Sequence, residues 1–374
     1  MLTNDILFVS RNGLPRLLEI LSQKICKIAF LGNSVTAQRN GYRSYLSDLI
    51  TNEFKPQHHF INAGIGGVGS FASAFFVDDF VLRHKPDICF VECTVADIEG
   101  ATPTHYITDS IHGIIKKLQS QKIVICFLYL FNSSKSTKKC NQVISLYENV
   151  LSQYGIPSIN IYQTFSNNVN FGKTTINDLF IDGVHTTDLG ARLTAKYIFN
   201  GIKNICQLKT EENIWTDVID QPHFKLEFTK IIKPEEWVIQ SSKNISRNKF
   251  KGVISYIELK NSEFISFKVA EGAFCGILLV VDQYSGVISI QHNSNDILVQ
   301  TFDNWCDKER LQVVILEQPI KYNTTITISL SEFDRADRGA NIFPNIQVKK
   351  GTSTKIVGFL NSLDNRPDKI NLLW

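Results

Sequence analysis

Hydrophobic residues follow two different patterns along the chain. Between residues 25 and 205, short runs rich in Val, Ile, Phe and Cys alternate with longer segments whose apolar positions recur at helical spacing. The short runs are nearly continuous, which is typical of parallel strands covered by helices on both faces. Strands are therefore expected at 27–32, 58–63, 87–93, 122–130 and 157–161, and helices at 42–54, 70–84, 104–120, 138–154 and 187–204. This succession predicts an α/β domain with a buried parallel sheet.

The pattern changes after about residue 210. Short stretches such as GVISYIEL and TTITISL then alternate apolar with polar residues and are separated by turn-forming Gly, Asn, Asp and Ser. This spacing predicts an all-β domain, an antiparallel β-sandwich or jelly roll. We therefore expect three parts: an N-terminal helical extension over 1–24, in which LPRLLEILSQ has an amphipathic pattern, the α/β domain over 25–210, and the β-sandwich domain over 211–374.

Length and composition agree with this division. At 374 residues the chain is longer than one hydrophobic core usually serves, so two domains are expected. Its apolar fraction of 43% and charged fraction of 20% are those of a globular protein. A formal net charge of +3 gives no electrostatic reason to expect a nucleic-acid partner.

The sequence favours a cytoplasmic protein without membrane insertion. Asp5 and Arg11 interrupt the apolar N-terminal stretch that a signal peptide would need, and no segment reaches the roughly 18 apolar residues of a membrane span. Eight cysteines lie mostly in apolar runs, as expected for buried free thiols in a reducing compartment. Cys89 and Cys93 stand four apart, but without a second pair or nearby histidines no metal site is expected.

The first candidate for chemistry follows the first strand of the predicted sheet. In FLGNSVTAQ the strand leads directly into Gly32, Asn33 and Ser34, and a helix begins near Tyr42. Open α/β sheets bind their ligands at the carboxyl ends of the strands, so a serine nucleophile would be well placed here. The alternative is that Gly32 and Asn33 form an ordinary turn and that Ser34 caps the next segment.

The second candidate is the glycine-rich segment INAGIGGVGS, residues 61–70, which follows the second strand. Glycines let backbone N–H groups come close to a reacting oxygen, as an oxyanion hole requires. A phosphate-binding loop is the alternative. However, the glycine spacing matches neither the dinucleotide fingerprint nor the P-loop, and no lysine follows, so the oxyanion hypothesis is favoured.

The third candidate is an Asp-x-x-His pair. The aspartate of such a pair can accept a hydrogen bond from the imidazole Nδ1–H, which leaves Nε2 free to take a proton from a serine. The sequence contains this pattern three times, as Asp109–His112, Asp182–His185 and Asp220–His223. We expect His112 to face solvent on its helix, and His223 begins the second domain. Only His185 is expected in a loop after a strand of the α/β domain, so Asp182 and His185 are the favoured pair.

These motifs together resemble the four sequence blocks of the SGNH (GDSL-like) hydrolases, a superfamily of serine esterases and acyltransferases. The matching segments are GNS, NAGIGG, VECTVAD and DGVH, in that order within residues 25–205. The resemblance implies a flavodoxin-like three-layer domain with Ser34 as nucleophile, His185 as base and Asp182 orienting His185. It also implies oxyanion donors from the backbone of Ser34 and Gly67.

Two positions depart from the family pattern. Asn33 replaces the aspartate of the first block but keeps a turn-forming, hydrogen-bonding side chain. In the third block Ala96 stands where the family has an asparagine whose amide is an oxyanion donor. Losing one such donor typically costs on the order of 10² to 10³ in rate, so we expect a slower enzyme or a substitute donor such as Thr94 or a substrate hydroxyl. Asp97 is expected to be structural, and Asn33, Thr94 and Asp97 are the candidate substrate contacts.

The resemblance implies an acyl-serine enzyme without a tightly bound cofactor. Family members with an added β-sandwich often act on carbohydrate esters, which by analogy of fold favours the O-acetyl groups of a small-molecule or glycan substrate. A cytoplasmic location favours a polysaccharide O-acetyltransferase with acetyl-CoA as acyl donor over a carbohydrate O-acetyl esterase. The replacement of the asparagine by Ala96 also suggests a third possibility, a non-catalytic glycan-binding protein on the same scaffold.

Overall fold

The computed structural model describes residues 7–9, 11, 15–23, 25–54, 57–170, 175–207, 226, 229–233, 236, 238–241, 246–250, 254–260, 262–301, 309–321, 323–331 and 353–362. The chain divides into two compact units, Met1–Glu227 and Phe228–Trp374. The segment expected to join the two domains lies largely outside the described residues. Among the described helices, none is both long enough and apolar enough to cross a membrane.

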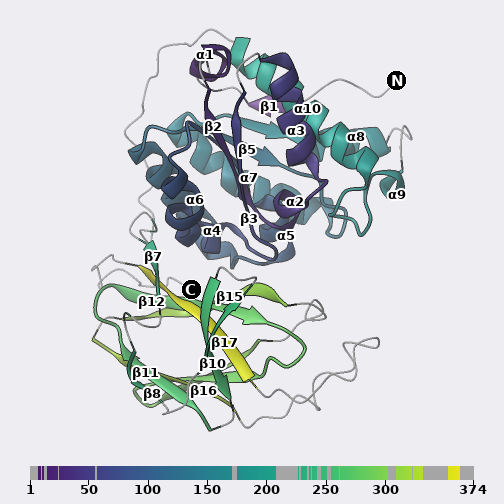
Figure 1. The fold of residues 1–374 in the computed structure, drawn as a ribbon. Helices are drawn as coiled ribbons and strands as arrows, with labels where there is room; N and C mark the ends of the chain where they lie inside the picture. Colours follow the sequence, from purple (N-terminus) through teal and green to yellow (C-terminus); the bar gives the residue numbers. More distant parts are fainter. Residues whose placement is uncertain are drawn as a thin grey trace. The chain divides into compact units, whose positions relative to one another are not determined.

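The first unit is built on a six-stranded sheet with the order β1-β6-β5-β4-β2-β3 (Figure 1). Its strands are β1 (Leu7–Val9), β2 (Lys27–Gly32), β3 (His59–Gly64), β4 (Ile88–Glu92), β5 (Val124–Tyr129) and β6 (Ser158–Asn160). The strands from β2 to β6 are parallel, as expected, and all five expected strands are present. The expected fold class, a flavodoxin-like α/β domain, is confirmed.

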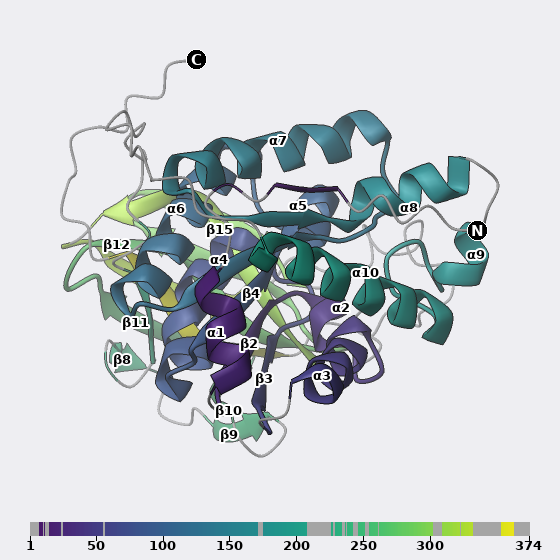
Figure 2. The same ribbon diagram turned by 90° about the horizontal axis from the view of Figure 1, so that it is seen from above.

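Helices cover both faces of this sheet (Figure 2). They are α1 (Pro15–Gln23), α2 (Ser34–Ala37), α3 (Tyr42–Glu53), α4 (Ser70–Phe76), α5 (Thr94–Glu99), α6 (Thr104–Ser120), α7 (Thr137–Tyr154), α8 (Ile161–Asn170), α9 (Ile176–Leu179) and α10 (Asp188–Gln207). The helix expected over 70–84 changes after α4 into a π-helical turn, Val77–Val81, and a 3₁₀ turn, Leu82–His84. Helices α1 and α3 pack against α10, whereas α4 and α7 pack against α6. The three-layer arrangement follows from these two groups.

The strand order reverses at the end of β2. Strands β3 and β4 follow β2 in sequence but lie on its two sides. Open α/β sheets bind their ligands at such a switch point, outside the carboxyl ends of the strands. Ser34, two residues after the end of β2, is placed at this switch point.

The structure corrects one expectation about α6. We expected His112 to face solvent, but its side chain is fully buried, and its Nδ1 lies 2.9 Å from the Tyr154 hydroxyl of α7. The reason is that α6 packs against both α4 and α7, so its buried face is wider than a single apolar stripe. Asp109 is buried on the same helix, so this Asp-x-x-His pair is a structural part of the core.

The N-terminal extension is part of the first unit and contains a strand as well as the expected helix. β1 pairs antiparallel with β6 and forms the edge of the sheet. Arg11 donates a hydrogen bond of 2.5 Å to the Ile156 carbonyl and forms an ion pair with Glu148. A three-residue strand is too short to be recognised from its hydrophobic pattern.

The second unit consists of two antiparallel sheets, which confirms the predicted β-sandwich (Figure 1). One sheet has the order β15-β12-β17-β10-β9, with β7 paired to β17, and the other has the order β14-β13-β16-β11-β8. Their strands are β7 (Thr229–Ile232), β8 (Val238–Ser241), β9 (Ser246–Phe250), β10 (Ile254–Lys260), β11 (Phe264–Lys268), β12 (Ala273–Val281), β13 (Val287–His292), β14 (Asn295–Gln300), β15 (Arg310–Lys321), β16 (Thr325–Leu330) and β17 (Ser353–Ser362). Inward-facing side chains from both sheets form one core, in which Phe267 and Phe359 stack at 4.2 Å.

Candidate active site

Ser34 lies on a tight turn at the end of β2. It is the first residue of α2, and the Asn33 side chain caps this helix by accepting a hydrogen bond of 2.9 Å from the Val35 N–H. Gly32 is required at the turn because a β-carbon there would lie 2.3 Å from Thr36 Oγ1. Gly32 therefore permits a tight turn that any side chain at this position would block. This turn holds Ser34 at the end of β2.

Asp182 and His185 share the loop that precedes α10. Asp182 Oδ2 lies 2.7 Å from His185 Nδ1, while Oδ1 accepts hydrogen bonds from the backbone N–H groups of Val184 (3.1 Å) and His185 (2.8 Å). Partial burial by itself raises the pKa of Asp182, but these hydrogen bonds outweigh it, and the pKa is lower than usual. The carboxylate therefore stays ionised beside the imidazole and fixes its orientation.

The structure brings these three residues together. His185 Nε2 lies 2.8 Å from Ser34 Oγ, so an unbroken chain of hydrogen bonds runs from the Asp182 carboxylate through the imidazole to the serine hydroxyl. The His185 side chain is 28% exposed and that of Asp182 is 34% exposed. A hydroxyl, an imidazole and a carboxylate in this order are the parts of a serine nucleophile with its base.

Two residues that sequence reasoning missed hold this loop from opposite sides. Gln38, just after α2, donates a hydrogen bond of 3.0 Å from Nε2 to the Thr186 carbonyl. Ser133, in the loop after β5, donates to the Gly183 carbonyl from its backbone N–H at 3.0 Å. Each contact joins segments far apart in sequence, and although Gln38 ends the segment FLGNSVTAQ, no sequence signal indicated that either residue contacts the loop of His185.

The glycine-rich segment passes directly beside Ser34. At Gly64 a β-carbon would lie 2.4 Å from the backbone nitrogen of Ala37, and at Gly66 it would lie 3.9 Å from Ser34 Cβ. Gly67 has a φ of 74°, a backbone conformation that favours glycine. Neither the Ser34 N–H nor the Gly67 N–H donates to a protein acceptor among the described residues.

Asp97 fixes the far end of this segment. Its Oδ1 accepts a hydrogen bond of 2.8 Å from the Ser70 N–H at the start of α4, and its Oδ2 accepts one of 2.6 Å from the Tyr147 hydroxyl of α7. Burial raises the pKa of Asp97, and these hydrogen bonds act in the opposite direction. Gly69 is needed beside it, because a β-carbon there would lie 2.3 Å from Asp97 Oδ1.

The three candidate substrate contacts are all buried. Asn33, Thr94 and Asp97 are each at most 1% exposed and are engaged within the protein. Thr94 donates its hydroxyl hydrogen bond of 3.3 Å to Glu92 Oε1, and its position in α5 is buried. In this structure these side chains support the walls of the site. Ala96, also in α5, is 7% exposed and supplies no polar atom from its side chain.

A buried carboxyl that the sequence did not single out lies beneath the serine turn. Glu92, the last residue of β4, pairs in register with Gly32 and is fully buried. Its pKa is raised to about 7: burial and nearby Asp97 raise it, while the hydrogen bonds from Val95 and Thr94 and the influence of the Asn33 side chain partly lower it. A glutamate inside an apolar run, in VECTVAD, was a signal that could have found it.

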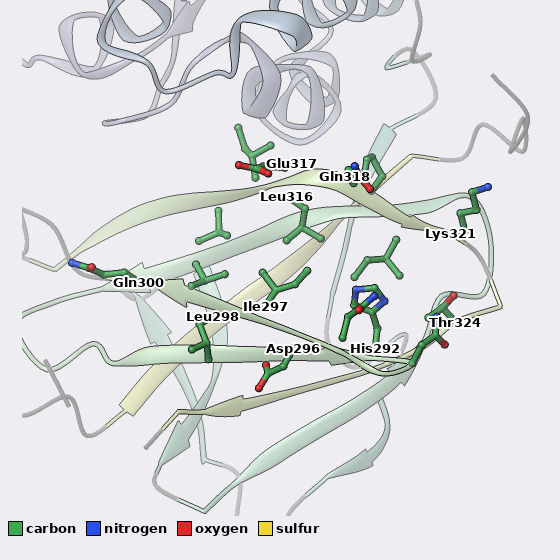
Figure 3. Close-up of a pocket in the computed structure, with 17 residues that line it drawn as sticks. His292, Asp296, Ile297, Leu298, Gln300, Leu316, Glu317, Gln318, Lys321 and Thr324 are labelled. Carbon is green, nitrogen blue, oxygen red and sulfur yellow. The ribbon is translucent and has the colours of Figure 1, made fainter. Parts of the chain in front are cut away.

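The pocket shown in Figure 3 is separate from these residues. It has a volume of about 850 Å³ and lies in the second unit, where the edge strands β14 and β15 line it. Ile297, Leu298 and Leu316 supply apolar surface, and His292 and Asp296 supply polar groups. Among the described residues, no group of His, Cys, Asp and Glu side chains could hold a metal ion. Cys26, Cys89, Cys93, Cys126, Cys140 and Cys275 are buried, and none of these six forms a disulfide bond.

Comparison with known proteins identifies relatives by structure. The chain resembles the crystal structure of a two-domain esterase active on acetylated mannans, with a TM-score of 0.73 and 16% identity over 96% of this chain and 98% of the other. A structure of such an esterase co-crystallised with mannopentaose matches with the same TM-score, 17% identity and coverage of 96% and 97%. An acetyl xylan esterase, AlAXEase, matches over 46% of this chain and 98% of its own, with a TM-score of 0.40 and 21% identity.

No protein-family model and no curated protein matches the sequence. At these identities the structural likeness shows the fold. The expected fold, a flavodoxin-like α/β domain followed by a β-sandwich, is therefore confirmed over nearly the whole chain.

Proposed function

We propose that this protein is a serine esterase that removes O-acetyl groups from carbohydrates. One observation carries the proposal: the hydrogen-bonded chain from Asp182 through His185 to Ser34 at the switch point of the sheet. A serine that lacks a base is a poor nucleophile, and the contacts of His185 with Ser34 and Asp182 support the roles of base and orienting group that we propose for His185 and Asp182.

In the proposed reaction Ser34 Oγ attacks the carbonyl carbon of the ester while His185 Nε2 takes the hydroxyl proton. The tetrahedral intermediate collapses, the bond between the carbonyl carbon and the sugar oxygen breaks, and His185 returns the proton to that oxygen. Water then attacks the acyl-serine, gives its proton to His185, and the carboxylic acid leaves as Ser34 regains its hydrogen. Asp182 stabilises the imidazolium in both halves by accepting its Nδ1–H.

The backbone N–H groups of Ser34 and Gly67 are the proposed donors to the oxyanion. Among the described residues neither has a protein acceptor, and the glycines of the 64–69 segment let this backbone approach the serine. The buried Thr94 hydroxyl is committed to Glu92, which leaves a substrate hydroxyl as the candidate for a third donor. A site with two backbone donors is the arrangement that we propose.

Hydrolysis is favoured over transfer by the exposure of the base. Because about a quarter of the His185 surface and a third of the Asp182 surface are exposed, water can reach the base once the first product has left. The likeness in fold to an esterase active on acetylated mannans supports an acetylated carbohydrate as the substrate class. Transfer from acetyl-CoA to a glycan would use the same acyl-serine and is distinguished by experiment.

The test combines active-site labelling with product analysis. The wild-type protein is expected to react with a fluorophosphonate probe at Ser34 and to release acetate from acetylated mannan or xylan, and the Ser34→Ala variant is expected to do neither. Acetylated glycan formed from acetyl-CoA, without release of acetate from acetylated sugars, would replace the esterase by a transferase. Absence of labelling in folded protein would instead indicate a non-catalytic glycan-binding protein.

A further inference from the structure

Two buried polar atoms of opposite character lie beneath the nucleophile turn without a hydrogen-bond partner among the described residues. They are the donor Asn33 Nδ2 and the acceptor Glu92 Oε2. Their side chains are 1% and 0% exposed. The two residues are neighbours because Gly32, directly before Asn33, pairs in register with Glu92. An unsatisfied buried polar atom is costly, so two complementary ones side by side need an explanation.

The remaining polar atoms of both side chains are already engaged. Asn33 Oδ1 accepts the Val35 N–H that caps α2, and Glu92 Oε1 accepts from the Val95 N–H at 3.1 Å and from the Thr94 hydroxyl at 3.3 Å. Asn33 is also one of the side chains whose hydrogen-bonding influence lowers the Glu92 pKa. Because Oδ1 is occupied, the group that Asn33 offers to Glu92 is its Nδ2 amide.

We infer that Glu92 is a positioning residue for the proposed reaction: its ionised carboxyl accepts from Asn33 Nδ2 and so holds the turn that directs Ser34 toward His185. The inference rests on the proposed function. The Asn33 amide then makes two contacts. Its Oδ1 caps the start of α2, and its Nδ2 donates to the Glu92 carboxylate. Ser34 is the next residue, so a rotation of this amide moves the backbone that carries the nucleophile.

Protonation of Glu92 reverses this arrangement. The proton would reside on Oε2, because Oε1 already accepts two hydrogen bonds, and an O–H would then face the N–H₂ of Asn33. Two facing donors repel, and turning the amide to offer Oδ1 removes the cap from Val35. The titratable groups near Glu92 are Asp97 on α5, Cys93 after β4 and Tyr42 on α3.

Among these three neighbours, only Asp97 affects the charge of Glu92 at neutral pH. Burial raises the pKa of Cys93 and that of Tyr42, so both stay neutral, whereas Asp97 opposes ionisation of Glu92. With a pKa of about 7, Glu92 changes its protonation state within the pH range in which a serine esterase is assayed. The inference thus predicts that activity falls as Glu92 gains its proton at lower pH.

The decisive experiment exchanges the amide and the carboxyl. Glu92→Gln turns an N–H₂ donor toward another donor, either the Asn33 amide or the Val95 N–H. Asn33→Asp places a second carboxylate beside Glu92. Each single variant should therefore lose about tenfold or more in kcat at pH 8. In the double variant Glu92→Gln/Asn33→Asp, the new amide can accept from the Val95 N–H through its oxygen and donate through its nitrogen to the new carboxylate. That carboxylate can still cap α2. We expect the double variant to recover to within about threefold of wild type.

Two controls separate positioning from stability. Glu148→Gln removes another largely buried carboxyl, one that accepts from Ser158 at 2.7 Å, and it is expected to lower stability without changing the pH profile. Thermal unfolding of every variant identifies any that fails to fold. If Glu92→Gln does not fold, the comparison of Asn33→Asp with the double variant still tests the inference, because rescue requires the exchanged pair.

The pH profile supplies a readout that a purely structural role would not change. As the pH falls through the range in which Glu92 gains its proton, kcat/KM of the wild type should fall about tenfold further than that of the double variant. Additive losses in the double variant, or the same fall with pH in both proteins, would overturn the inference. Fluorophosphonate labelling of wild-type Ser34 keeps this result distinct from a failure of the proposed function, which would abolish labelling altogether.

Discussion

Ser34 Oγ and His185 Nε2 lie 2.8 Å apart although 151 positions separate the two residues in the sequence. The sheet produces this proximity, because β2 ends at the switch point and the loop before α10 returns to the same edge. Gln38 and Ser133 fix the loop from two sides, so the distance is set by the scaffold. The consequences for activity follow from this arrangement.

Removing the nucleophile or the base should abolish most of the activity. We expect Ser34→Ala and His185→Ala each to lower kcat/KM for an acetyl ester by at least about 10³-fold, and the double variant to lose no more than the single ones, because the two residues act as a unit. Steady-state hydrolysis of p-nitrophenyl acetate measures this. His105→Ala, which alters an exposed histidine of α6, serves as the control, and a fully active His185→Ala would contradict the assignment.

Replacing the orienting carboxylate should reduce turnover rather than binding. In Asp182→Asn the imidazole loses its anionic partner, and we expect kcat to fall by about 10² to 10⁴ with little change in KM. Since the hydrogen bonds around Asp182 lower its pKa, the carboxylate of the wild type stays charged from pH 9 down to pH 5. Kinetics from pH 5 to 9 test this, and an unchanged kcat would show that His185 acts without Asp182.

The bridge from Gln38 to the Thr186 carbonyl should contribute to catalysis by holding the loop. Gln38→Ala removes a donor at 3.0 Å, and we expect a loss of about tenfold in kcat. Gln163→Ala, on α8, removes a comparable local contact to Asn167 and is the matched control. Equal effects of the two substitutions would assign Gln38 to stability alone.

Gly64 should be intolerant of any side chain. A β-carbon there meets the Ala37 backbone nitrogen at 2.4 Å, so Gly64→Ala must displace either the glycine-rich segment or α2. We expect activity to fall by at least about tenfold. Gly100→Ala provides the comparison, since its β-carbon would meet nothing within 4 Å although its φ of 94° is strained. That variant should lose stability but keep its activity.

Glu92 should make stability depend on pH in an unusual direction. Its carboxyl has a pKa of about 7 in the folded chain against 4.5 as the ordinary value, so between these pH values the folded state binds more protons than the unfolded state. Stability contributed by the protonated group is therefore lost as pH rises through this window. As the pH rises from 4.5 to 8, the free energy of unfolding of Glu92→Gln should therefore increase by about 3 kcal/mol relative to that of the wild type. Urea denaturation at both pH values measures it, and parallel pH curves would contradict it.

Sequence patterns predicted the fold of both units well, because the hydrophobic pattern of each unit is strong. The buried strands of the α/β unit are continuous apolar runs, and the alternating stretches after residue 210 indicated the β-sandwich. Ser34, Asp182 and His185 could be placed in advance because each follows or precedes a recognisable element. The roles assigned to them remain proposals for the experiments above.

The residues that hold the loop of His185 could not be predicted from the sequence, because they act through tertiary contacts. Gln38 and Ser133 reach the loop of His185 only after the sheet has formed, and the short strand β1 carries too little pattern to be recognised. His112 was misplaced because the helical period does not reveal how many neighbours a helix packs against. Glu92 was visible as a charge within an apolar run, but its partner Asn33 became apparent only from the register of β2 with β4.

The order of the catalytic parts along the chain also has a consequence for biosynthesis. Ser34 leaves the ribosome before His185, its proposed base, which lies 151 residues later in the chain. Since domains generally fold from the N-terminus as the chain is made, a nascent chain that stops before residue 185 carries a serine hydroxyl of ordinary reactivity. Covalent labelling of ribosome-bound chains of increasing length would therefore report the moment at which the α/β unit closes.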